Sequence, residues 1–89
     1  MRFQPGFLAS TPGALEALED AKQSPAEFIV RHCNGDWGEV GKEDAAENEF
    51  SVDKDLRILS AYRTNKGVRI WVITEADRSS TTILLPEEY

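Results

Sequence analysis

The sequence predicts an α+β fold in which two short helices precede a three-stranded antiparallel β-meander. Helix-start signals occur twice in the first third of the chain, at Thr11-Pro12 and at Ser24-Pro25. From Leu56 onward the apolar residues recur with a period of two, which is typical of β-strands. The 89 residues, 40% of them hydrophobic, fit one small domain over positions 1–89.

The two helices are expected at about Pro12–Lys22 and Pro25–Cys33. Thr11 and Ser24 can each accept a hydrogen bond from a free backbone N–H, and proline suits the first helical position because its missing N–H would be unpaired anyway. Glu27, three residues after Ser24, fits a capping box. The connection is very short, so the helices form a hairpin or a sharp elbow.

Two further elements are expected in addition to the two helices and the meander. A short edge strand is expected near Gly6–Ala9, because the preceding Pro5 is tolerated at the edge of a sheet. Lys42–Phe50 has the composition of a short acidic helix, although its apolar residues do not form one stripe.

Three strands are expected, at Arg57–Thr64, Val68–Glu75 and Thr81–Leu85. Asn65-Lys66-Gly67 fits a three-residue hairpin loop, and this loop sets Arg63 opposite Arg69 in the first hairpin. With Ala76–Ser80 as the second turn, Ile83 lies beside Ile73.

Both faces of this predicted sheet are substantially apolar, and two short helices can cover only one of them well. We expect the uncovered face to be an interaction surface anchored by Trp71, because aromatic residues often dominate such contacts. Its expected members are Leu59, Trp71, Ile73, Ile83 and Leu85. The partner on this surface is expected to be another protein or a second copy of the chain.

The polar loop between the last two strands contains Asp77, Arg78 and Ser79. Short polar side chains such as aspartate and serine bond readily to nearby backbone, so we interpret the loop chiefly as a turn. Arg78 has no partner in the pattern and is expected to project into solvent. A partner-binding role for this loop remains the alternative.

Charge and composition exclude several classes of function. The net charge is −6, and residues 36–55 alone carry eight acidic and two basic groups, which argues against non-specific coating of nucleic acid. A single cysteine excludes an internal disulfide, and no metal or cofactor motif is present, so no metal site and no cofactor are expected. No apolar run has the length of a membrane helix or signal peptide, and we expect a cytoplasmic protein.

His32 and a pair of arginines are the residues most suggestive of chemistry. His32 could act as a general acid or base, but a helix-end histidine stabilised by the helix dipole is the simpler interpretation. Arg63 and Arg69 could hold an anion between them. They could also extend into water or pair with the acidic middle segment.

Four segments, TPGALEALE, SPAEFIVRHCNGDWGE, RILSAYRT and IWVITEADRSSTTILLPEEY, together resemble a family of small bacterial proteins labelled plasmid-related. Members of that family travel with plasmids and integrative conjugative elements. The resemblance covers nearly the whole chain and implies a setting on mobile genetic elements rather than a particular chemistry.

A second resemblance, at the level of the fold, is to the barnase–colicin–RelE group of small metal-independent RNases. Those enzymes place helices before an antiparallel meander, with a helix-borne Arg-His pair and a hydroxyl residue before a late proline. Arg31-His32 and Thr81-Thr82 before Pro86 fit that outline. The catalytic residues implied by this resemblance are Arg31, His32, Arg63, Arg69 and Thr82.

The sequence therefore favours a non-catalytic protein-interaction module associated with mobile genetic elements. The alternative function is a small RNase that uses His32 and the arginines of the sheet.

Overall fold

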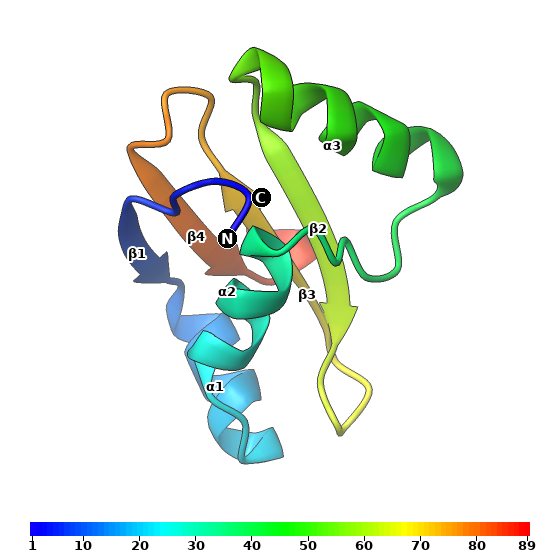
Figure 1. The fold of residues 1–89 in the computed structure, drawn as a ribbon. Helices are drawn as coiled ribbons and strands as arrows, with labels where there is room; N and C mark the ends of the chain where they lie inside the picture. The colour runs from blue at the N-terminus through cyan, green and yellow to red at the C-terminus, as the bar shows by residue number, and fades with distance from the viewer.

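The computed structural model describes residues 1–89 and consists of three α-helices and one four-stranded mixed sheet (Figure 1). The elements in chain order are β1 (Phe7–Ser10), α1 (Pro12–Ala21), α2 (Pro25–Cys33), α3 (Lys42–Lys54), β2 (Ile58–Arg63), β3 (Arg69–Thr74), β4 (Ser80–Leu84) and a short 3-10 helix, η1 (Pro86–Glu88). The α+β class and the two N-terminal helices are confirmed.

The sheet is larger than the predicted meander. Its strand order is β1-β4-β3-β2, in which β2, β3 and β4 form the antiparallel meander and β1 joins β4 in parallel at the edge. The edge strand expected near Gly6–Ala9 is therefore present one residue later. The acidic helix also forms, and it continues four residues beyond the predicted end at Phe50.

The hydroxyl residues before the two prolines start α1 and α2 as predicted. The Thr11 side chain accepts a hydrogen bond from the Ala14 N–H at 3.2 Å, and the Ser24 side chain accepts one from the Ala26 N–H at 3.2 Å. The capping box predicted at Ser24 does not form. The Glu27 carboxylate instead accepts a hydrogen bond from the side chain of Gln23 at 3.0 Å.

The register of the β2–β3 hairpin is as predicted, with Arg63 opposite Arg69. The predicted register between β3 and β4 is wrong by one residue, because Thr82, not Ile83, lies opposite Ile73. The turn is shorter than expected. The Glu75 N–H donates to the Ser80 carbonyl at 3.0 Å, so β4 begins at Ser80.

This shift changes the face on which the apolar residues of β4 lie. Ile83 lies opposite Val72 on the helix-covered face and is only 1% exposed. Leu85 lies beyond the end of β4 and packs against the core, so neither residue belongs to the predicted interaction surface. Leu84, opposite Trp71, occupies the far face instead.

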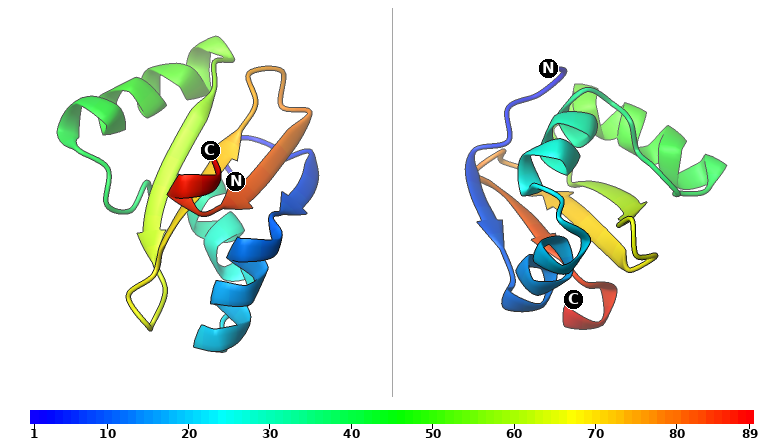
Figure 2. Two further views of the ribbon diagram at one scale, coloured as in Figure 1. Left: turned by 180° about the vertical axis from the view of Figure 1, so that it is seen from behind. Right: turned by 90° about the horizontal axis from the view of Figure 1, so that it is seen from below.

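Helices α1 and α2 cover one face of the sheet, and η1 lies across the other face (Figure 2). The main core fills the space beneath the helices; its buried members are Phe3, Ala14, Leu18, Phe28, Ile29, Cys33, Trp37, Ile58, Tyr62, Ile70, Val72 and Ile83. Helix α3 lies beside β2, at the opposite edge of the sheet from β1 (Figures 1 and 2).

The outer edge of β2 is closed by the preceding chain. The Asn48 side chain of α3 bonds both backbone groups of Leu59, accepting from its N–H at 3.2 Å and donating to its carbonyl at 2.8 Å. The N–H of Ala61 donates to Trp37, and its carbonyl accepts from Glu39. Gly38, between them, has a φ of +72° and lies directly against the backbone of β2.

Gly38 provides a test of this closed edge. A Cβ at Gly38 would overlap the carbonyl oxygen of Ala61, whereas a Cβ at Gly67 (φ +81°) meets no atom within 4 Å. We expect Gly67→Ala to cost about 1–2 kcal/mol of unfolding free energy from backbone strain alone. Gly38→Ala should cost roughly 1–3 kcal/mol more, because the overlap also forces backbone to move. Urea denaturation measures both, and equal losses would contradict the close approach.

Candidate functional site

His32 of α2 is fully buried in the core, where its side chain contacts the sheet. Its Nδ1 is 2.6 Å from the Ser60 hydroxyl of β2, and its Nε2 is 2.9 Å from the Thr74 hydroxyl of β3. Thr74 is in turn 2.6 Å from Thr81 of β4, and the Thr81 hydroxyl donates to the Pro5 carbonyl at 2.7 Å. One chain of hydrogen bonds therefore connects α2, three strands and the N-terminal segment.

The Pro5 carbonyl, which ends this chain of hydrogen bonds, determines the tautomer of His32. A carbonyl oxygen only accepts, so Thr81 donates to Pro5 and must accept from Thr74. Thr74 then accepts from Nε2–H, which leaves Nδ1 of His32 to accept from the Ser60 hydroxyl. Burial and the positive charge of Arg78 lower the pKa of His32 to about 4. The imidazole is thus a neutral core group with both nitrogens bonded.

The residues of the predicted RNase site are not brought together. Thr82 lies opposite Ile73, on the sheet face away from His32. Arg31 pairs with Asp36 at 2.6 Å, outside the hydrogen-bonded chain around His32. The imidazole is also fully buried.

One of the two opposed arginines of the first hairpin forms an ion pair within the chain. Arg63 pairs with Glu39 at 2.9 Å, which is one of the alternatives left open by the sequence. Arg69 lies opposite Arg63 and is exposed. Arg63 therefore has an acidic partner from the segment before α3.

Arg78 of the polar loop points inward, contrary to the prediction that it projects into solvent. Its guanidinium donates to the carbonyls of Ser51 at 2.8 Å and Leu56 at 2.7 Å, near the end of α3. The Ser51 carbonyl also accepts from the Leu56 N–H at 3.1 Å, and the five donors of an arginine can bond several carbonyls at once. Arg78 also adopts a left-handed backbone conformation (φ 60°), and its side chain is 14% exposed.

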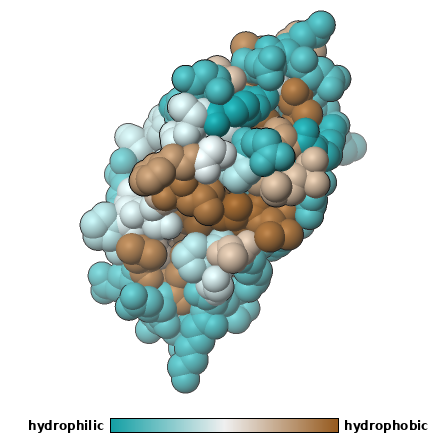
Figure 3. All heavy atoms as spheres, turned by 60° about the vertical axis from the view of Figure 1, so that its left-hand side comes forward, coloured by the Kyte–Doolittle hydropathy of each residue, from teal (hydrophilic) through white to brown (hydrophobic).

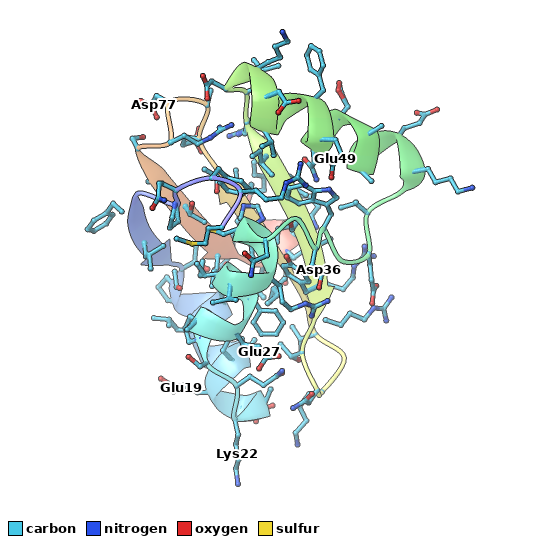
Figure 4. The ribbon with its side chains drawn as sticks, in the orientation of Figure 1. Glu19, Lys22, Glu27, Asp36, Glu49 and Asp77 are labelled. Carbon is cyan, nitrogen blue, oxygen red and sulfur yellow. The ribbon has the colours of Figure 1, made fainter.

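The remainder of the loop is a turn, as predicted. The Asp77 side chain accepts a hydrogen bond from the Ser79 N–H at 2.9 Å and caps the bend locally. Asp77 lies at the outer end of the loop (Figure 4).

The far face of the sheet is more closed than the sequence suggested. Ile73 is buried, and Leu59 and Trp71 are half-buried. The ring of Tyr89, after η1, packs edge-on against Trp71 with 5.7 Å between centroids. The C-terminal tail therefore occupies much of the surface that was expected to bind a partner.

An apolar groove lies on the other side of the molecule. It lies between β1 and the helices α1 and α2 and has a volume of about 350 Å³. The lining residues are Leu8, Ala9, Ser10, Leu15, Pro25, Ala26, Ile29, Val30 and Ile83. None carries a charge, and an apolar patch bordered by polar residues is visible on this side of the molecule in Figure 3.

Three apolar residues that line this groove are exposed, Leu8 (53%), Leu15 (41%) and Val30 (54%), and so is Phe7 (74%), which precedes Leu8 on β1. Exposed apolar residues are ordinary when scattered singly, whereas a group beside a groove is typical of interaction surfaces. We refer to these four residues together with the groove as the β1 groove surface.

The strand beside the groove also has a free edge. The N–H groups of Phe7 and Thr11 donate to the carbonyls of Ser79 and Ile83, at 2.9 and 3.0 Å. Since these groups alternate along a strand, the N–H and C=O groups of Leu8 and Ser10 point away from the sheet. The outer edge of β1 is therefore open, in contrast to that of β2.

Sequence reasoning missed the β1 groove surface, although it predicted both the helices and the edge strand. The spacing of Leu15 and Leu18 along their helix predicts that both are buried, but Leu15 is exposed. The sequence does contain an indication of this surface in Leu8 and Val30, two apolar residues that the predicted core does not use. Their proximity depends on the pairing of β1 with β4, a contact between the two ends of the chain.

Comparison with known proteins finds no relative: no family model matches the sequence, no curated protein is significantly similar to it, and no solved structure matches the fold. The resemblances given by the sequence therefore stay predictions. None of the helices has the length and apolarity needed to cross a bilayer. No three side chains of His, Cys, Asp or Glu are grouped in a way that could hold a metal ion.

The buried imidazole leads to a prediction about pH. Unfolded His32 binds a proton as the pH falls through 6.5, whereas folded His32 does so only near pH 4. The unfolded state therefore binds more protons in this window, and acid should lower the unfolding free energy by up to about 3 kcal/mol. Urea denaturation between pH 7.5 and 4.5 measures the slope.

The control is His32→Gln, which should be less stable at neutral pH but nearly independent of pH between 7 and 5. The carboxylates titrate in both proteins, so their contribution cancels in the comparison. Parallel pH profiles for the two proteins would show that His32 is not the responsible group.

Proposed function

We propose that the protein is a non-catalytic protein-interaction module that binds an extended polypeptide segment on its β1 groove surface. The observation that carries this proposal is the combination of an open strand edge with an uncharged groove directly beside it. An open edge offers backbone donors and acceptors, and an adjoining groove accepts side chains. These are the two components of peptide recognition by strand addition.

The chemistry of the two components favours an extended peptide over other ligands. A strand added beside β1 can exchange backbone hydrogen bonds with Leu8 and Ser10. Alternate side chains of that strand then point toward the helices, where Ile29 and Ile83 form part of the groove lining. Backbone bonding supplies affinity, and the groove selects apolar residues at every second position.

The lining also supports a binding role over a catalytic one. Ser10 is the one hydroxyl residue among the nine lining residues, and no histidine or carboxylate accompanies it to act as a base. The mobile-element setting remains a prediction of the sequence resemblance, and the proposal does not depend on it.

A selection of displayed random linear peptides against the immobilised protein tests this proposal. We expect enrichment of sequences with apolar residues at alternate positions. Leu15→Glu and Val30→Glu should each weaken a selected peptide at least about tenfold, because each places a charge beside the apolar groove.

Phe50→Glu is the matched control, since Phe50 is also exposed but lies on α3 at the opposite edge of the sheet. Its affinity for the same peptide should be unchanged. Failure to enrich any peptide, or selected peptides that bind equally to Leu15→Glu and to the unchanged protein, would refute the proposed function.

A further inference from the structure

We infer that β1 of a second copy of the chain also occupies this site, so that two copies join their sheets edge to edge into one eight-stranded sheet. This inference rests on the proposed function, because it uses the same open edge and the same groove. It names a specific segment as occupant, Phe7–Ser10, which has the extended backbone that strand addition requires.

The positions of the free backbone groups determine the register of such a pair. Leu8 and Ser10 carry the outward N–H and C=O groups, so an antiparallel twofold arrangement places Leu8 opposite Ser10 of the second copy. Ala9 then lies opposite Ala9 of the second copy, on the twofold axis. Each Leu8–Ser10 pair can exchange both of its backbone hydrogen bonds.

The side chains of β1 suit this register on the helix-covered face. Leu8 and Ser10 lie beside Thr81 and Ile83, whose side chains are on that face. In the pair, the large Leu8 of one copy meets the small Ser10 of the other, at the groove that Ser10 lines. Each copy therefore supplies an apolar side chain to the groove of the other.

The register also gives the most exposed apolar side chain a neighbour. Phe7 is 74% exposed and lies on the far face of the sheet together with Ala9. Across the twofold axis, Phe7 is the diagonal neighbour of Ala9 of the second copy, within reach of an aromatic ring. The small alanine leaves room for both phenylalanine rings to cover the centre of the joined sheet.

The distribution of charge permits two acidic copies to meet at this edge. The nine groove residues carry no charge, whereas residues 36–55 carry the entire −6 excess. That segment includes α3, which lies at the β2 edge of the sheet, away from β1 (Figure 1). In the proposed dimer the two acidic helices are at opposite ends of the joined sheet, where repulsion is screened by salt.

The contact between the two copies is small. A four-residue strand with four exposed apolar side chains gives an interface at or below about 1,200 Å², the low end for specific complexes. Interfaces of this size are typical of weak, reversible complexes. Dimer formation and peptide binding then compete for one edge.

Sedimentation velocity of the full chain between about 1 and 500 µM tests the dimer. We expect a shift from the 10.0 kDa monomer toward twice that mass as concentration rises. Leu8→Lys should abolish the shift, since a charge on an edge strand opposes strand pairing. Phe50→Lys, the matched control on α3, should leave it intact, and thermal melts verify that both variants are folded.

Cysteine cross-linking tests the register. In this arrangement Ala9→Cys should form a disulfide-linked dimer under mild oxidation, because residues on the twofold axis face each other within disulfide range. Phe7→Cys should cross-link far less, since Phe7 lies opposite Thr11 of the second copy. The natural Cys33 is buried and should not contribute.

The outcomes separate this inference from the proposed function. A chain that stays monomeric yet binds peptides sensitive to Leu15→Glu overturns the dimer and leaves the proposed function standing. A monomer that binds no peptide overturns both. A dimer that persists in Leu8→Lys, or that lacks the Ala9→Cys cross-link, uses another surface and also overturns the inference.

Discussion

The hydrogen bonds of the buried His32 ring fix the relation between the helical layer and the sheet. An imidazole removed from water must have both nitrogens paired, because a buried polar group without a partner costs about 1–3 kcal/mol. Ser60 and Thr74 provide those partners from adjacent strands, and Thr81 continues the chain to the Pro5 carbonyl. Any movement of α2 along the sheet would break this pairing, so the polar chain restricts the core to one packing arrangement.

The same chain of hydrogen bonds explains why β4 does not adopt the register that the hydrophobic pattern predicts. The predicted register, with Ile83 beside Ile73, would turn Thr81 to the far face and leave Thr74 without its acceptor. The observed register places Thr81 opposite Thr74, inside the core. A polar network has therefore outweighed apolar periodicity. The sequence could not indicate this, because threonines in a strand are equally typical of a solvated face.

The features that the sequence predicts correctly depend on local interactions, and the features that it does not predict depend on long-range contacts. The caps at Thr11 and Ser24, and the hairpin at Asn65-Lys66-Gly67, depend on neighbouring residues and were predicted correctly. The inward direction of Arg78 depends on the carbonyls of Ser51 and Leu56, near the end of α3 and more than twenty positions away. The β1 groove surface likewise depends on the parallel pairing of the first strand with the last.

The N-terminal segment connects the polar core to the open edge. Phe3 packs edge-on against His32 at 5.2 Å between centroids, and Arg2 forms two hydrogen bonds with Glu49 of α3. Gly6, with a φ of +68°, brings the chain against the backbone of Arg78 immediately before β1. These contacts fix the side of β1 that pairs with β4 and leave the backbone groups of its outer edge unpaired.

The two edges of the sheet thus differ for physical reasons, and only the β1 edge can pair with another strand. Asn48 and the segment around Gly38 occupy the backbone groups of β2, which removes that edge from any pairing with another chain. At β1 the apolar residues stand beside unpaired backbone groups instead. Strand pairing at β1 alone limits assembly to two copies. Once the β1 edge of each sheet is paired and its β2 edge is closed, no further strand can be added to form a fibre. The closed β2 edge is therefore as important to a finite assembly as the open β1 edge is to its formation.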